Sequence, residues 1–288
     1  MIPIVAHKIK QIELHTKRLM QVNLLGQARS RVKGSGLEFD QLRDYEMGDD
    51  VRAIDWNSSA RNNKLLIKQF NDERQRTIII ALDISHSCFY GSDTQLKEDV
   101  LAQFAAIISY AAMVNKDEVG LLLFNQKVHV YIPPAKGRAH VQLILEKIFS
   151  AEPQSGQTNF DAALEYLASL RKKNAMVFLI SDFITQDFEK KLAIAARMYD
   201  IVAIRMLDEF EKQFPVSGLI RVHDNETHQT HILDVRNKKN NNLTTILHQR
   251  LEEQNKILSR YRIDLLEVGN NGQPIDQLIS FFKTRALR

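Results

Sequence analysis

The sequence predicts an α/β protein built on a doubly wound, Rossmann-like and mostly parallel β-sheet. Three segments of strand length carry this prediction, at residues 77–82, 118–124 and 175–182. They are apolar at nearly every position, which is typical of strands buried on both faces of a sheet. Helical patterns separate them, and connections of that length link neighbouring parallel strands through crossovers.

The other elements follow from the same reasoning in chain order. Apolar residues at helical spacing predict helices at residues 8–33, 96–114, 138–149, 156–170 and 188–198. They also predict a helix that ends at about residue 260 and another at the C-terminus. Alternating or short apolar runs predict strands near 65–67, at 127–132, at 200–207 and at 262–268, and a hairpin at 219–223 and 230–235. The strand at 127–132 follows a two-residue turn, so we expect it to run antiparallel to its neighbour.

Composition bounds the class of protein. The chain has 288 residues, 44% of them hydrophobic and 26% charged, which allows a sizeable core. No uncharged apolar segment reaches the ~18 residues that a membrane-spanning helix needs. The charged residues Lys8, Lys10 and Glu13 argue against a signal peptide, and a single cysteine excludes an internal disulfide framework. We therefore expect a soluble, cytoplasmic protein.

Positive charge is concentrated near the two ends of the chain. Residues 1–33 hold seven Lys or Arg against one Glu, and residues 236–262 hold seven against two. Such basic ends could contact nucleic acid, an anionic surface or an acidic protein, or they could be solvated helix faces. Aromatic residues interleaved with the basic ones, which would favour nucleic-acid binding, are scarce there.

We divide the chain into three parts. Residues 1–72 form an N-terminal extension, 73–210 the sheet-based core, and 211–288 a hairpin, a helix, a last strand and a terminal helix. Within the extension, a stretch dense in both charge signs also holds aromatic residues, so we expect it to be ordered. Its polar and aromatic residues are candidates for a partner-facing patch or for a structural clasp onto the sheet: Arg43, Asp49, Asp50, Arg52, Asp55, Trp56 and Arg61.

Oxygen-bearing side chains follow the predicted strands. Asp83, Ser85 and Ser87 come directly after the first strand, Thr158 precedes a helix, and Asp182 ends another strand. The carboxyl ends of neighbouring parallel strands meet at one crevice, and an oxygen-only ligand set suits Mg²⁺ or Mn²⁺. The alternative is that these residues bond local backbone in turns, with Thr158 or Asn159 acting as a helix cap.

The candidate site favours binding over catalysis. If the hydroxyls bind the ion directly and the aspartates bind partly through water, the ion keeps its positive charge and attracts a carboxylate from another protein. No activated base or nucleophile is evident, and no Walker motif occurs. A phosphoester hydrolase using Asp83 is the alternative, although that chemistry needs a second acid where Ser85 stands.

The motif Asp83-x-Ser85-x-Ser87, with Thr158 and Asp182, resembles the metal-ion-dependent adhesion site of von Willebrand factor A domains. Residues 34–76, which include GDDVRAIDW, resemble the signature of the bacterial domain-of-unknown-function 58 family. This resemblance covers roughly residues 25–270. It implies a von Willebrand factor A-like fold and a metal held by those five residues.

The same resemblance implies a partner. Members of the family are often linked with MoxR-type AAA+ ATPases, as adaptors or chaperone partners. Many carry two N-terminal membrane helices, and this chain resembles the short soluble members; Cys88 stands where the family often has Met. The sequence therefore predicts a non-enzymatic, Mg²⁺-dependent protein-interaction module whose metal is completed by an acidic residue of the partner.

Overall fold

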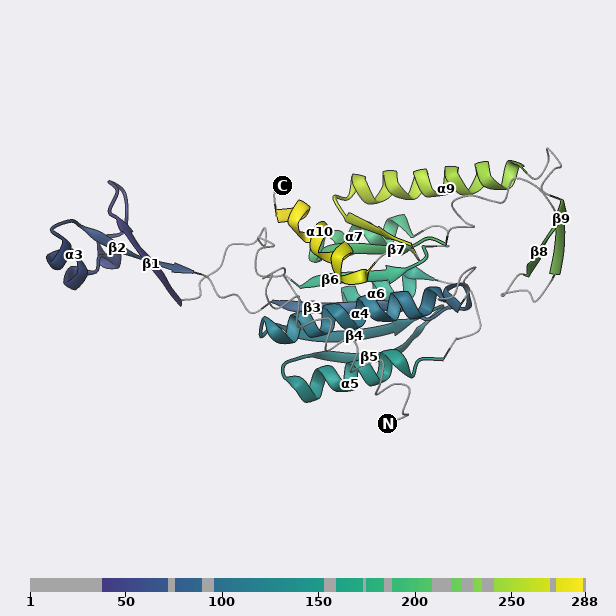
Figure 1. Ribbon diagram of the computed structural model, residues 1–288, viewed down its shortest axis with the longest axis horizontal. Helices are drawn as coiled ribbons and strands as arrows, with labels where there is room; N and C mark the ends of the chain where they lie inside the picture. Colours follow the sequence, from purple (N-terminus) through teal and green to yellow (C-terminus); the bar gives the residue numbers. More distant parts are fainter. Residues whose placement is uncertain are drawn as a thin grey trace. The chain divides into compact units, whose positions relative to one another are not determined.

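The computed structural model describes residues 38–71, 76–89, 96–152, 159–172, 175–183, 188–208, 219–223, 230–234, 241–269 and 273–286 (Figure 1). The chain divides into two compact units, one of residues 30–75 and the other of residues 1–29 with 76–288. The helix predicted at residues 8–33 lies outside the described residues. Among the helices of the described part, none is long and apolar enough to cross a membrane.

The larger unit is built on a six-stranded sheet. In chain order its strands are β3 (Thr77–Asp83), β4 (Glu118–Phe124), β5 (Val128–Ala135), β6 (Met176–Ser181), β7 (Asp200–Met206) and β10 (Asp264–Val268). Their order in space is β10-β7-β6-β3-β4-β5, and only the β4–β5 pair is antiparallel. The chain thus starts mid-sheet, winds to one edge and returns to build the other, which confirms the doubly wound prediction.

Apolar side chains of the central strands pack on both faces of the sheet. Along β3, Ile78, Ile80 and Leu82 belong to one core cluster, whereas Ile79 and Ala81 belong to another. This alternation follows from the two-residue period of a strand. It explains why the sequence is apolar at consecutive positions rather than at every second one.

Among the described residues, three helices cover each face of the sheet. The first cluster is completed by α4 (Lys97–Val114), α5 (Arg138–Phe149) and α10 (Pro274–Ala286). The second is completed by α6 (Phe160–Leu170), α7 (Glu189–Met198) and α9 (Asn241–Arg260). Twelve of the 18 residues of α4 are buried, as its nearly uniform apolar pattern predicts.

Strand β5 forms one edge of the sheet among the described strands and contains two consecutive prolines, Pro133 and Pro134. The register between β4 and β5 shifts beside them, between Val119 and Leu121. Gly120 lies at this irregularity, where an added Cβ would meet Ile132 O at 2.8 Å. The absence of a side chain at Gly120 therefore lets the proline-containing strand approach closely.

The smaller unit contains two short strands and a helix. β1 (Glu38–Asp44) pairs antiparallel with β2 (Leu66–Asn71), and η1 (Val51–Ala53) and α3 (Trp56–Asn62) lie between them in the chain. The sequence predicted only the short strand near residue 66. The predicted hairpin further along is confirmed as β8 (Leu219–His223) paired antiparallel with β9 (Thr230–Asp234).

Candidate metal centre

Two carboxylates meet at the carboxyl ends of adjacent parallel strands. β3 ends at Asp83 and β6 ends at Ser181, and Leu82 pairs with Ile180 in the register between them. Asp182 follows immediately, so it lies next to Asp83 at the same edge of the sheet. Asp83 is 3% exposed and Asp182 1%. Ligand atoms of Asp83, Asp182 and Cys88 lie within 4.8 Å of one another.

The two serines of the motif lie in a turn that Asp83 begins. The Ser85 amide donates to Asp83 Oδ1 at 2.9 Å, which closes an Asx-type turn directly after the strand. Ser85 Oγ lies 2.9 Å from Ser87 Oγ, at the start of the short helix η2 (His86–Phe89). The turn predicted as an alternative to metal binding therefore exists, and it also brings the two serine hydroxyls together directly after Asp83.

Ser181 is a functional residue that sequence reasoning missed. Its hydroxyl donates to Asp83 Oδ2 at 2.6 Å and accepts from the Phe183 amide at 3.0 Å. Because Ser85 and Ser181 each hold one carboxylate oxygen, Asp83 has a fixed orientation. The available signal was a hydroxyl at the last position of an apolar strand, immediately before an aspartate.

Thr158, the fifth predicted ligand, lies outside the described residues, and its role stays a prediction. The next residue, Asn159, is the N-cap of α6 and accepts from the Asp161 amide at 2.9 Å. The Asn159 amide also donates to Asn125 O at 3.1 Å, directly after β4. Of the two cap candidates, Asn159 is thus the cap, and α6 begins at the same edge of the sheet as the carboxylates.

A buried lysine accompanies the carboxylates. Lys97, the first residue of α4, is 1% exposed, and its Nζ lies 3.9 Å from Asp182 Oδ2. This contact could not be predicted from the sequence, because a lysine at a helix end is ordinarily solvated. Lys97 supplies one positive charge to a site with two carboxylates.

Burial dominates the electrostatics of the site. It raises the pKa of Asp83 to about 7, with a further contribution from the negative charge of Asp182. The pKa of the Cys88 thiol is likewise raised well above its usual value, first by burial and then by the two aspartates. A thiol in this state is a poor nucleophile, because only the thiolate attacks.

These residues fit a hard divalent cation. Buried carboxylates need a cation or hydrogen-bond donors to offset their desolvation, and the raised pKa of Asp83 shows that its hydrogen bonds from Ser181 and Ser85 do not outweigh burial and the charge of Asp182. Carboxylate and hydroxyl oxygens are ligands for Mg²⁺ or Mn²⁺, whereas the protonated thiol of Cys88 suits such ions less well. Asp83, Ser85, Ser87 and Asp182 could therefore hold such an ion.

The predicted partner patch of the smaller unit contains an ion pair that is structural. Arg43 forms a bidentate ion pair with Asp49, in which Nη1 donates to Oδ2 at 2.7 Å and Nη2 donates to Oδ1 at 2.6 Å. The Glu46 amide also donates to Asp49 Oδ2 at 2.9 Å. The bond from Arg43 holds the pKa of the Asp49 carboxyl below its usual value. This fork closes the loop that leaves β1.

The rest of the patch divides in two. Asp50 caps η1 by accepting from the Arg52 amide at 2.9 Å, and Asp55 caps α3 by accepting from the amides of Asn57 and Ser58. The side chains of Arg52, Trp56 and Arg61 are exposed, with Trp56 at 63%. Four of the seven predicted residues thus build the loop, and three remain at the surface of this unit.

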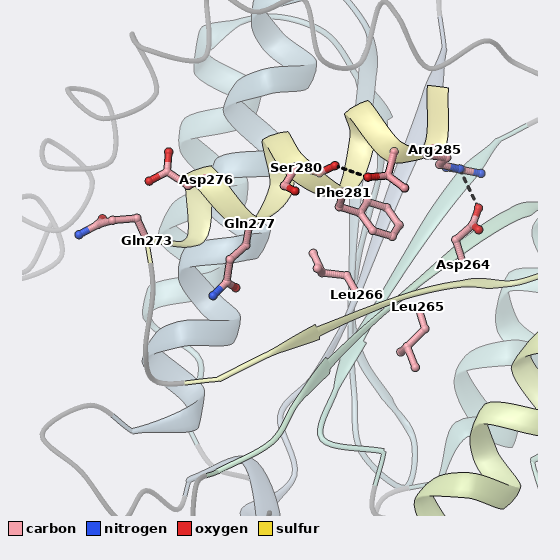
Figure 2. Close-up of a pocket in the computed structure, with 10 residues that line it drawn as sticks. Asp264, Leu265, Leu266, Gln273, Asp276, Gln277, Ser280, Phe281 and Arg285 are labelled. Atoms are coloured by element: carbon pink, nitrogen blue, oxygen red, sulfur yellow. Dashed lines mark hydrogen bonds and ion pairs between the residues drawn. The ribbon is translucent and has the colours of Figure 1, made fainter. Parts of the chain in front are cut away.

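An open groove lies apart from the candidate metal ligands. It has a volume of about 710 Å³ and runs between the edge strand β10 and helix α10 (Figure 2). Arg285 lies at one end, where its Nε contacts Asp264 Oδ2 at 2.9 Å. None of the candidate metal ligands lines this groove.

The chain is similar in sequence and in structure to known proteins. The family model "Protein of unknown function DUF58" matches residues 41–252. Uncharacterized protein Rv1480 of Mycobacterium tuberculosis is 26% identical over 228 residues, which cover 78% of this chain and 72% of that protein. Among solved structures, the conserved hypothetical protein BatB of Bacteroides thetaiotaomicron matches with a TM-score of 0.48 and 13% identity, over 74% of this chain and all of that one. The SpRpn10 VWA domain matches with a TM-score of 0.42 and 11% identity, over 72% and 94%.

Proposed function

The chain belongs to the DUF58 family, and from that premise we propose that it is a non-enzymatic, metal-dependent protein-interaction module. One observation carries the proposal. Two buried carboxylates, Asp83 and Asp182, meet at the carboxyl edge of a doubly wound sheet, where Ser85 bonds Asp83 and the Ser87 hydroxyl contacts that of Ser85. That edge is where open α/β sheets bind their ligands.

Each residue has a separate task in this proposal. Asp83, Ser85, Ser87 and Asp182 would hold Mg²⁺ or Mn²⁺, and Thr158, which lies outside the described residues, is the predicted fifth ligand. The bound ion would supply an open coordination position for a carboxylate of the partner. Ser181 and the Ser85 amide fix both oxygens of Asp83, so that its orientation is set before an ion arrives.

The geometry supports binding more than hydrolysis. A nucleophilic aspartate needs an oxygen that can reach the substrate, whereas Asp83 is buried. The buried Cys88 thiol has a raised pKa and is correspondingly unreactive. Turnover of phosphoesters that is abolished in Asp83→Asn would contradict the proposal.

We propose an acidic protein as the partner class and a MoxR-type AAA+ ATPase as the specific candidate, from the family resemblance. The exposed Trp56, Arg52 and Arg61 of the smaller unit would give such a partner a second point of contact. Indole and guanidinium groups are enriched where protein interfaces concentrate their binding energy. This second contact needs no metal.

Calorimetry with Mg²⁺ and Mn²⁺ tests the metal claim. The wild type should bind the ion, Asp83→Ala should not, and Asp44→Ala should bind as the wild type does. Asp44 is a matched control because its side chain is 70% exposed and lies 3.9 Å from Lys64 Nζ in the other unit. Absence of binding at millimolar metal, or binding unchanged in Asp83→Ala, contradicts a metal centre here.

A pull-down from cell extract with and without EDTA tests the interaction claim. Partners held through the metal should be lost with EDTA and with Asp83→Ala. The nucleic-acid alternative predicts retention that weakens steeply with salt and ignores the chelator.

A further inference from the structure

We propose that Lys97 is a tethered cation that competes with the metal ion and sets the charge of the loaded site. This inference rests on the proposed function, because it concerns the same carboxylates. It assigns a specificity-determining role to a residue outside the predicted ligand set. Lys97 would make the loaded site positive, and so select one anionic group as its ligand.

The position of Lys97 indicates a role at the carboxylates. Its side chain is 1% exposed, although lysine is among the residues least often buried without a partner. As the first residue of α4 it also lies where the helix dipole disfavours positive charge. Glu98 and Asp99, the next two residues, are the types that this position favours. The end of the helix therefore disfavours the Lys97 ammonium, whereas the Asp182 carboxylate favours it.

The contact between Lys97 and Asp182 is an electrostatic attraction and not a hydrogen bond. Nζ lies 3.9 Å from Asp182 Oδ2, beyond ordinary hydrogen-bond length, and both side chains are at most 1% exposed. An ammonium on a four-carbon stem can shift without rebuilding the backbone. The arrangement suits a counter-ion that yields its place more readily than a fixed, bidentate guanidinium would.

Charge counting gives the consequence for ligand choice. Asp83 and Asp182 contribute two negative charges and Lys97 one positive charge, so the ionised site carries one net negative charge. A divalent ion changes this to one positive charge, and a single carboxylate then brings the buried site to neutrality. Without Lys97, the ion alone would reach neutrality, and a carboxylate would leave an uncompensated buried charge.

Competition follows from the same geometry. The ammonium and the ion are attracted to the same carboxylates and repel each other, and exclusion of water strengthens both effects. The protein alone should therefore bind the metal weakly, and a carboxylate should strengthen metal binding. By linkage, the metal strengthens binding of the carboxylate by the same factor.

The experiment compares Mn²⁺ binding by the full chain at pH 8 in four proteins, by calorimetry and by electron paramagnetic resonance of free Mn²⁺. Lys97→Met removes the charge and keeps most of the stem, and Lys97→Arg keeps the charge. Lys191→Met is the matched control, because Lys191 pairs with Glu165 on the surface at 2.5 Å. We expect Lys97→Met to bind Mn²⁺ about tenfold more tightly than wild type. Lys97→Arg should bind Mn²⁺ no more tightly than wild type, because a guanidinium yields its place less readily, and Lys191→Met should stay close to wild type.

Thermal melting shows whether the Lys97→Met variant is folded. Lys97→Met leaves two buried carboxylates without their cation, so its melting temperature should fall without metal and recover when Mn²⁺ is added. Lys97→Arg keeps the charge, so its melting temperature should fall less without metal and should rise less when Mn²⁺ is added.

The outcomes separate the two claims. Equal or weaker Mn²⁺ binding by folded Lys97→Met, with binding by wild type intact, overturns the role of Lys97 and leaves the proposed function standing. Absence of binding in all four folded proteins overturns the metal centre and this inference together. Tightening in Lys97→Arg as large as in Lys97→Met also overturns the inference, because charge would then not be the cause.

Discussion

Ser181→Ala tests whether the bond to Asp83 is a main support of the site. The substitution removes the 2.6 Å hydrogen bond to the buried Asp83 carboxylate and the acceptor of the Phe183 amide at 3.0 Å. A hydrogen bond to a charged group contributes about 1.5–3 kcal/mol, and a buried amide left without its acceptor costs about 1–3 kcal/mol. Because the two effects share one hydroxyl and are not independent, we expect the free energy of unfolding to fall by about 2–4 kcal/mol at pH 8.

Urea denaturation of the metal-free protein measures this loss. Ser169→Ala is a matched control, because the Ser169 hydroxyl also donates a 2.6 Å bond, to Tyr166 O, but on an exposed surface. Its effect should stay within about 0.5 kcal/mol, as is usual for surface substitutions. Near pH 5 the loss in Ser181→Ala should shrink, because a protonated Asp83 accepts a weaker hydrogen bond. Equal losses in the two variants would refute the reasoning.

Three further predictions concern other parts of the molecule. Since the folded pKa of Asp83 is raised to about 7, its contribution to stability is present at low pH and is lost as pH rises through 7. Asp83→Asn should therefore flatten the pH dependence of the melting temperature of metal-free protein between pH 5 and 8; an unchanged slope contradicts this. Arg205→Met should lower the free energy of unfolding by about 2–3 kcal/mol in urea, because the buried guanidinium bonds Gln254, Asn255 and Glu267; a neutral result argues that apolar packing can replace them. Trp56→Ala should change that free energy by less than about 0.5 kcal/mol yet weaken partner capture in pull-downs; unchanged capture removes Trp56 from the proposed contact.

The central fold could be predicted because its information is local. Uninterrupted apolar runs identify β3, β4 and β6, and β/α alternation implies a parallel sheet with its polar ends on one edge. That rule places Asp83 and Asp182 at the same edge of the sheet, and the pairing of β3 with β6 in the structure makes them neighbours. It requires no knowledge of which side chains pack against which.

The missed features depend on distant contacts. Lys97 has the sequence context of a solvated helix end, and only the folded chain shows its ammonium beside Asp182. Arg205 interrupts an apolar strand, and its partners are 49 to 62 residues further along the chain. Strand β1 escaped prediction because it mixes both charge signs and pairs with a single partner, so burial imposes no clean pattern on it.

The two prolines of β5 also affect how copies of the chain behave when crowded. An exposed sheet edge is a template on which another molecule can add a strand, which is how many proteins begin to aggregate. Backbone amides point alternately to the two sides of a strand, so consecutive prolines at 133 and 134 remove one donor from each side, whatever the register. Among the described strands β5 is such an edge, and the missing donors oppose the pairing of another strand along it. Replacing both prolines by residues with an amide hydrogen would restore a continuous template along this strand.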